Sequence, residues 1–163
     1  MKSFSLILIF CAMHCVQTKS YSQHIPLGID KKDFLVQVNK IGSGIYIYSP
    51  HPDSLTGDSV IIGADAVMMF GRTGYLDYNE NKNGKIDMFS LTIKDCSKAD
   101  YEEVFKNLAS EFRLSTTGSN KDTTVETKDG TVMRAWQHIK GNDEVTDVFL
   151  FYYRDRKLII TYF

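Results

Sequence analysis

Apolar and polar residues alternate along most of the chain, and this period of two predicts a protein built mainly from β-strands. The alternating segments and short β-branched runs are bounded by glycine, proline, asparagine or aspartate. The predicted strands cover residues 33–39, 45–48, 59–70, 75–78, 85–93, 123–128, 131–139, 145–153 and 157–163. Within the third segment we expect a bulge at Gly63, and a helix over 64–70 is the alternative.

The segments between these strands carry turn signals that indicate which strands pair. Asn83-Gly84 and Asp129-Gly130 are typical of two-residue hairpins, because type I′ turns need positive φ angles. The glycines at 42–44 predict a hairpin between the first two strands. Further turns are expected at 49–53, 71–74, 141–143 and 154–156. The last four strands are therefore expected to form an antiparallel meander.

One segment departs from the period of two and predicts the main helix, over about 98–112. Ser97 precedes it and can accept a backbone N–H of the first turn, with Asp100 three residues further on. Apolar residues recur at helical spacing and form one stripe: Tyr101, Val104, Phe105, Leu108 and Phe112. This helix should lie across the sheet.

Together these elements predict an α+β fold. We expect an antiparallel, twisted sheet of about six to eight strands, packed by one main helix and ending in a C-terminal β-meander. No internal repeat is visible in the sequence. The length of 163 residues suits one domain with a core of useful size.

The first residues follow a different pattern, that of a secretory signal. Lys2 is followed by an uncharged apolar run over 4–13, which is too short to span a bilayer. Small residues at Ser20 and Ser22 predict cleavage after residue 22, with cleavage after Ser20 as the second option. We therefore expect a signal peptide over 1–22 and one domain over 23–163, exported to the periplasm or the cell exterior. A buried N-terminal strand or helix is the alternative.

Charge and cysteine content limit the classes of partner, the means of membrane attachment and the disulfides that we expect. The net charge is −1, and cleavage leaves 17 basic against 20 acidic residues, so we expect no nucleic-acid partner. Cys11 and Cys15 follow bulky residues, and we therefore expect no lipid anchor. Cleavage would leave Cys96 as the one remaining cysteine, and we expect it to be buried and to form no disulfide. No later segment is apolar enough to predict a membrane span.

Residues 79–90 contain the most specific motif in the chain, which resembles an EF-hand calcium loop. Asn79, Asn81, Asn83 and Asp87 fall at positions that carry ligands in such loops, and we take them as the candidate metal ligands. Two departures weaken the resemblance: the first position is not aspartate, and Ser90 stands where the loop needs a bidentate glutamate. An ordinary hairpin turn is the alternative interpretation.

Arg134, Trp136 and His138 share one face of the strand over 131–139. A cation, an indole and an imidazole side by side predict a site for an anionic or planar ligand. The alternative is a solvated sheet face on which the indole packs against neighbouring aromatic rings. The opposite face, formed by Met133, Ala135 and Ile139, is expected to point into the core.

The strand over 145–153 is apolar on both faces. Phe149, Phe151 and Tyr153 lie on one, and Val148, Leu150 and Tyr152 lie on the other. This pattern predicts a central strand that is covered on both sides. The helix would cover one face; loops, a ligand or a partner would cover the other.

Catalytic signatures are scarce. His51 beside Asp53, or His138 with a carboxylate, could act in acid–base chemistry, but no nucleophile elbow, zinc motif or phosphate-binding loop is present. We therefore expect a non-catalytic binding module without a cofactor, whose partner is a protein, a peptide or a small ligand. The alternatives are a small secreted hydrolase using one of these histidines, and a structural subunit of a cell-envelope assembly.

Overall fold

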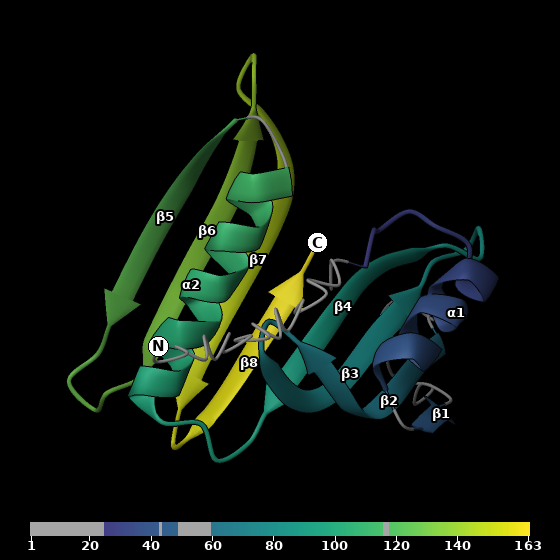
Figure 1. The fold of residues 1–163 in the computed structure, drawn as a ribbon, viewed down its shortest axis with the longest axis horizontal. Coiled ribbons are helices and arrows are strands. Elements are labelled where there is room, and N and C mark those ends of the chain that lie inside the picture. Colours follow the sequence, from purple (N-terminus) through teal and green to yellow (C-terminus); the bar gives the residue numbers. More distant parts are fainter. Residues whose placement is uncertain (1–24, 43, 49–59, 116–117) are drawn as a thin grey trace, which may run out of the picture.

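The computed structural model describes residues 25–42, 44–48, 60–115 and 118–163 (Figure 1). Within these ranges, two helices and eight strands follow one another. They are α1 (Lys31–Ile41), β1 (Gly44–Tyr48), β2 (Val60–Met69), β3 (Arg72–Glu80), β4 (Ile86–Ile93), α2 (Lys98–Ser115), β5 (Ser119–Glu126), β6 (Val132–Lys140), β7 (Glu144–Arg154) and β8 (Lys157–Tyr162).

All the strands belong to one antiparallel sheet in the order β1-β2-β3-β4-β8-β7-β6-β5. Each half of the sheet is a helix followed by four strands, and the halves meet where β4 pairs with β8. The strand order is therefore mirrored about the centre, an internal repetition of structure that the sequence does not reveal. The predicted fold class is confirmed, including the C-terminal meander β5 to β8.

Both helices pack on the same face of the sheet, which we call the helix face. Phe34 of α1 contacts Tyr78 of β3, with ring centroids 4.3 Å apart. Phe112 of α2 contacts Trp136 of β6 at 5.2 Å, and α2 lies over β6 and β7 (Figure 1). Tyr78 and Trp136 belong to one transverse row of paired residues that passes through β4, β8 and β7. The core is therefore a single layer between the helices and this face.

Helix α1 replaces the strand predicted over 33–39, so the predicted hairpin with 45–48 is wrong. Phe34 and Val38 are both fully buried, while Val36 between them is half exposed. The residues that pack are thus four apart, and Ile41 continues the stripe. The apparent alternation of three apolar residues concealed this spacing. The prediction of one main helix therefore missed a second, shorter one.

Strand β2 confirms the predicted strand and excludes the alternative helix over 64–70. Its bulge lies between Ala64 and Val67 rather than at Gly63, and Ala66 has a φ of 50° there. The turn that follows was expected at 71–74, but its two central residues are Phe70 and Gly71. Both have positive φ angles, and Met69 pairs with Arg72 across the turn.

Helix α2 confirms the predicted main helix and extends it by three residues at its C-terminus. The hydroxyl of Ser97 accepts the N–H of Asp100 at 3.1 Å, and the carboxylate of Asp100 accepts the N–H of Ser97 at 2.8 Å. These bonds satisfy two amide groups at the helix start. The Ser97 hydroxyl also donates a hydrogen bond to the Asp100 carboxylate at 2.7 Å, and this bond, followed by the one from the Ser97 N–H, holds the pKa of Asp100 below its ordinary value.

The predicted hairpins at Asn83-Gly84 and Asp129-Gly130 are confirmed, with a different backbone geometry. In each dipeptide only the glycine has a positive φ, 72° and 82° respectively, so neither is a type I′ turn. At 155–156, by contrast, both residues of a two-residue turn have positive φ angles although neither is glycine.

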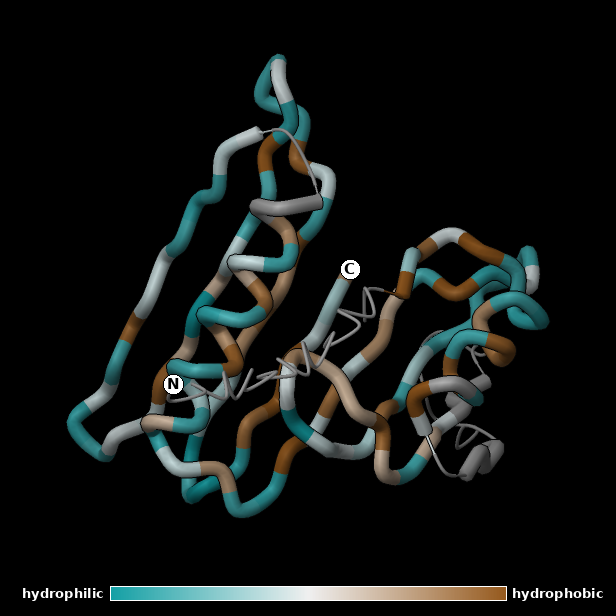
Figure 2. The backbone as a smooth tube through the Cα atoms, viewed as in Figure 1, coloured by the Kyte–Doolittle hydropathy of each residue, from teal (hydrophilic) through white to brown (hydrophobic). Residues whose placement is uncertain are grey.

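Figure 2 shows that apolar residues concentrate in the strands near the middle of the sheet, while the edge strand β5 is mostly hydrophilic. Cys96 is buried, as expected, and burial raises the pKa of its thiol. The predicted signal peptide over 1–22, Cys11, Cys15, His51 and Asp53 lie outside the described residues. No helix in the described part of the chain is long and apolar enough to cross a bilayer.

Candidate functional site

The three residues proposed as a ligand site lie on the helix face, beneath α2. Trp136 and His138 are 1% and 2% exposed, whereas Met133 on the opposite face is 46% exposed. The prediction that Met133, Ala135 and Ile139 form the core face is therefore wrong. The reason is physical: alternation separates two faces of a strand, but only the position of the helix decides which face is covered.

Trp136 is the centre of an aromatic cluster between α2 and the sheet. Its ring centroid lies 5.2 Å from that of Phe112 and 5.6 Å from that of Phe149. The ring of His138 stacks beside it, with centroids 6.3 Å apart. In the structure, therefore, the indole contacts aromatic groups of the protein itself.

Arg134 is held between α2 and β5. Its Nε lies 2.7 Å from the hydroxyl of Thr124 and 3.2 Å from the carboxylate of Asp122, and Nη1 lies 3.4 Å from Glu102. The guanidinium carbon also sits 3.9 Å from the centre of the Phe105 ring, a cation–π contact. The cation predicted to bind an anion is thus matched by two carboxylates.

His138 occupies the end of the cluster near the C-terminus of α2. Its Nδ1 lies 2.7 Å from the side-chain oxygen of Asn120, so Nδ1 is the protonated nitrogen and donates this bond. Nε2 is buried and has no hydrogen-bond partner among the described residues. The alternative hypothesis of a hydrolase requires a carboxylate beside His138. In the structure, the hydrogen bond of His138 goes to the neutral amide of Asn120.

Asp147 pairs with His138 in the strand register, but its side chain makes other contacts. The hydroxyl of Tyr162 donates a hydrogen bond to one carboxylate oxygen, and the hydroxyl of Thr146 donates to the other at 2.9 Å. Burial, followed by this bond to Asp147, raises the pKa of Tyr162 well above its ordinary value. This arrangement buries a carboxylate by supplying it with donors.

The loop that resembles an EF-hand is the hairpin between β3 and β4. The side-chain oxygen of Asn81 accepts the N–H groups of Asn83 and Lys85, at 2.9 and 3.2 Å. Asn79 pairs with Met88 across the hairpin, and Asp87 is exposed between the buried Ile86 and the half-buried Met88. In the described ranges, no group of three His, Cys, Asp or Glu residues is placed to hold a metal.

The opposite side of the sheet, which we call the open face, is not covered by either helix. A row of residues paired across six strands crosses it, and we call this the apolar row. Its members, in strand order, are Val125, Met133, Tyr152, Ile159, Thr92 and Tyr75. Strands lie about 4.8 Å apart, so the row is roughly 24 Å long.

Four of the six side chains in the apolar row are exposed, while Ile159 and Thr92 are half-buried. Val125, Met133 and Tyr75 are 52%, 46% and 39% exposed, and Tyr152 is 38% exposed. Leu150, in the next row, is 43% exposed. The expected cover on both sides of β7 is therefore absent within the described part of the chain, where only the face carrying Phe149 and Phe151 is buried.

Two polar rows border the apolar row. On one side, a cationic row consists of Arg154 on β7, Lys157 on β8 and Lys94 directly after the end of β4. Lys94 Nζ lies 4.7 Å from the centre of the Tyr75 ring. A hydrogen bond with Tyr152 is the main reason why the pKa of Arg154 is raised.

On the other side, a hydroxyl row runs through Asp77, Ser90 and Thr161, which are paired across β3, β4 and β8. The hydroxyls of Ser90 and Thr161 are 3.0 Å apart and hydrogen-bonded. This row continues through Leu150 on β7. The open face thus presents an apolar centre, a positive margin and a margin of hydroxyl and carboxylate oxygens.

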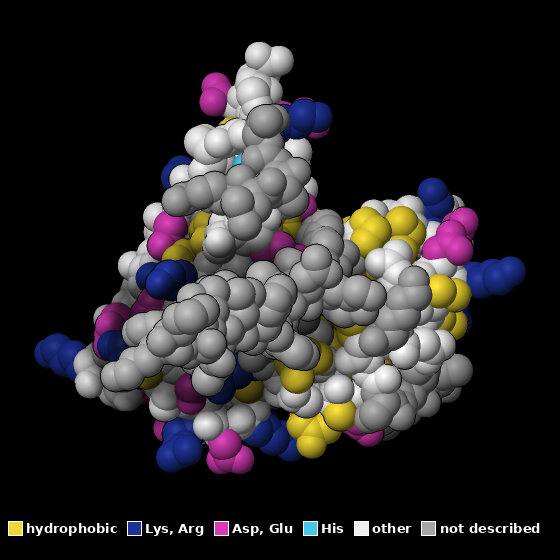
Figure 3. All heavy atoms as spheres, viewed as in Figure 1, with side chains coloured by type: hydrophobic (Ala, Val, Ile, Leu, Met, Phe, Trp, Pro, Cys, Tyr) yellow, Lys and Arg dark blue, Asp and Glu magenta, His cyan; other side chains and the backbone are white. Residues whose placement is uncertain are grey.

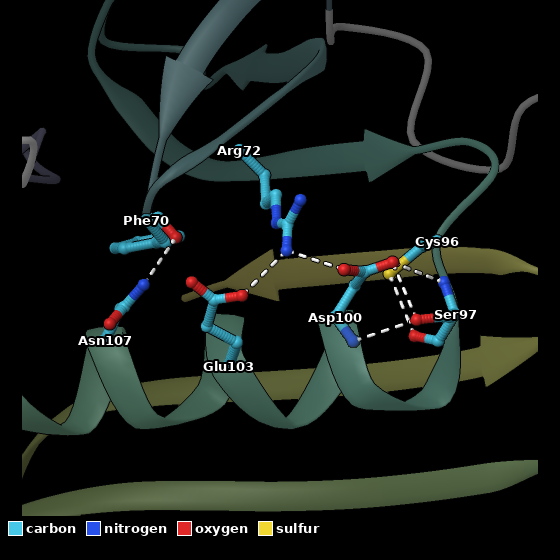
Figure 4. A network of polar contacts seen from close by, with 7 residues as sticks. All are labelled: Phe70, Arg72, Cys96, Ser97, Asp100, Glu103 and Asn107. Carbon is cyan, nitrogen blue, oxygen red and sulfur yellow. Dashed lines mark hydrogen bonds and ion pairs between the residues drawn. The ribbon is translucent and has the colours of Figure 1, made fainter.

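Contacts on the helix face hold the two halves of the sheet together (Figure 4). Arg72, at the start of β3, lies 2.6 Å from Asp100 and 2.7 Å from Glu103 on α2. The amide of Asn107 approaches the carbonyl oxygen of Phe70 at 3.5 Å. The β2–β3 hairpin of the first half is therefore bound to the helix of the second half, which supports the sheet behind the open face.

On the side of the molecule that carries the helices, positive and negative side chains are mixed. Figure 3 shows basic and acidic side chains mixed around the margin of the molecule. No protein-family model, curated protein or solved structure matches the chain. The candidate binding surface therefore rests on the geometry of the open face alone. The sequence pattern predicts the second apolar face of β7, but it does not reveal the contributions of Val125, Met133 and Tyr75, which depend on strand register.

Proposed function

We propose that this protein is an exported, non-catalytic binding module, and that the open face of its sheet is the binding surface. One observation carries the proposal: the apolar row exposes large side chains from neighbouring strands, with Leu150 beside them. Contiguous exposed apolar surface of a few hundred square ångströms is typical of interaction sites, because leaving it in water costs free energy.

The proposal of export rests on the sequence of the first residues. Lys2, the apolar run over 4–13 and the small residues at Ser20 and Ser22 are typical of a cleaved signal. We accordingly propose the periplasm or the cell exterior as the destination. A partner there meets the open face without competition from an intramolecular cover by the described elements.

The open face suits a partner with its own apolar surface. Met133 and Leu150 are flexible or branched apolar groups, and Tyr75 and Tyr152 combine a ring with a hydroxyl that remains hydrogen-bonded in an interface. Tyrosine is among the residues that contribute most of the binding energy in protein interfaces. A protein or peptide is therefore the preferred partner, and a small apolar ligand is the second choice.

Site-specific photo-crosslinking in the producing cells tests this proposal. A photoreactive residue is placed at Leu150 on the open face or at Val36 on α1, which is 50% exposed and serves as the matched control. We expect one discrete adduct from position 150 and none from position 36. The same adducts from both positions, or none from either, would contradict a binding role for the open face.

Catalysis is tested separately. The purified protein should show no turnover on a broad panel of hydrolase substrates. Turnover that disappears on substitution of His51 or His138 would refute the non-catalytic assignment.

A further inference from the structure

We propose that the partner of the open face is a second copy of this chain, bound face to face about a two-fold axis that runs along the apolar row. This inference rests on the proposed function, because it names the occupant of the same surface. Two sheets pack face to face about 10 Å apart, with strand directions within about 30°. Among the described elements, both helices occupy one side of the sheet, so the open face is the side on which these elements leave such packing sterically free.

The arrangement of the three rows selects this axis. Rotation about the apolar row places each of its residues opposite the same residue of the other copy, so Met133 meets Met133 and Tyr152 meets Tyr152. The same rotation exchanges the margins, so the cationic row of one copy lies opposite the hydroxyl row of the other. A two-fold axis along the strands would instead place cationic row against cationic row, which like charges disfavour.

The exchanged margins are chemically complementary. Lys94 and Ser90 lie on the same strand on opposite sides of the apolar row, so Lys94 of one copy faces Ser90 of the other. The carboxylate of Asp77 is one strand away from Ser90, within the reach of a lysine side chain. Lys157 likewise faces Thr161 on β8. Lys94 and Lys157 therefore meet oxygen acceptors, while the same rotation places Arg154 opposite Leu150.

The size of the surface predicts a reversible dimer. Six strands by three rows cover roughly 24 Å by 20 Å, or about 500 Å² in projection. This is below the roughly 800 Å² that each partner buries in an interface of standard size. Interfaces of this size are typical of weak, transient complexes, so we expect a dissociation constant in the micromolar range rather than a permanent dimer.

Sedimentation velocity on the purified protein, from low to high micromolar concentration, measures this association. The mass should rise from one chain to two with concentration. Met133 lies on the proposed axis, so Met133→Glu and Met133→Lys would each place two like charges, one from each copy, opposite one another. Each variant should therefore be monomeric. An equimolar mixture of the two variants should dimerise again. Val36→Glu, of similar exposure on α1, should behave as the wild-type protein.

Two results would overturn the dimer. One is a single-chain mass for the wild-type protein at all concentrations; the other is a mixture of the Met133 variants that fails to associate. Circular dichroism confirms that each variant is folded. If the protein is monomeric and position 150 still crosslinks to a different protein, the second copy is excluded and the binding role survives. If it is monomeric and position 150 gives no adduct, both proposals fail.

Discussion

Phe70 is the residue through which the β2–β3 hairpin is expected to contribute most to stability. It is 2% exposed, and its ring centroid lies 6.0 Å from that of Phe149 on β7, in the other half of the chain. Replacing a buried phenylalanine by alanine costs about 3 to 5 kcal/mol. We expect about 3 kcal/mol for Phe70→Ala, because a hairpin tip can partly collapse onto the space left behind.

Urea unfolding measures this loss. With a slope of about 2 kcal/mol per molar urea for a domain of this size, the midpoint should fall by about 1.5 M. The backbone provides an internal check, because Phe70 has a φ of 50° and glycine tolerates that region better by about 1 kcal/mol. Phe70→Gly should therefore be less destabilising than Phe70→Ala.

The control is Val36→Ala on the exposed side of α1, which should change the stability by less than about 0.5 kcal/mol. A loss below about 1 kcal/mol for Phe70→Ala would show that the hairpin does not bind the two halves together. An equal loss for glycine and alanine would show that the positive φ stores no strain.

Three other predictions concern single groups. Ser97→Ala should cost about 1 kcal/mol in urea unfolding and should raise the pKa of Asp100 in an NMR titration, because the bonds from Ser97 are the main cause of its lowered value; an unchanged pKa would contradict this cause. The bond from the Thr127 hydroxyl, followed by that from the Thr131 N–H, lowers the pKa of Asp129 from 3.8 to about 2. The stabilising contribution of the Asp129 carboxylate is therefore complete above about pH 4 and lost as the pH falls through about 2. Asp129→Asn should then make the free energy of unfolding less dependent on pH between these values. An identical pH profile in the variant and the wild-type protein would refute this role of Asp129. Cys96, buried and with a raised thiol pKa, should react with iodoacetamide far more slowly in the native protein than in urea, and equal rates would show that the thiol is accessible.

The β3–β4 hairpin and the second half of the fold were predictable from the sequence because their signals are local. The stripe of α2, the cap at Ser97 and the hairpins around Gly84 and Gly130 each depend on residues a few positions apart. Helix α1 was not predicted because its local pattern is ambiguous. Phe34, Val36 and Val38 fit a period of two as well as a helix, and only burial against Tyr78 distinguishes the two.

The candidate surface could be predicted only in part. The pattern of β7 showed that Leu150 and Tyr152 form a second apolar face, but their exposure depends on where both helices pack. The apolar row additionally needs the register of six strands, which brings Tyr75 and Val125 into line from positions fifty residues apart. The same missing information placed Trp136 on a ligand face when it lies beneath α2.

The native mass of the protein, purified without denaturation from the cells that produce it, tests the central claim most directly. We predict a mass above that of one chain for the wild-type protein and for Val36→Glu, and the mass of one chain for Met133→Glu, because only the last substitution places a charge in the apolar row of the open face. A single-chain mass for the wild-type protein, or the same bound mass in Met133→Glu, would contradict the assignment of the open face as the binding surface.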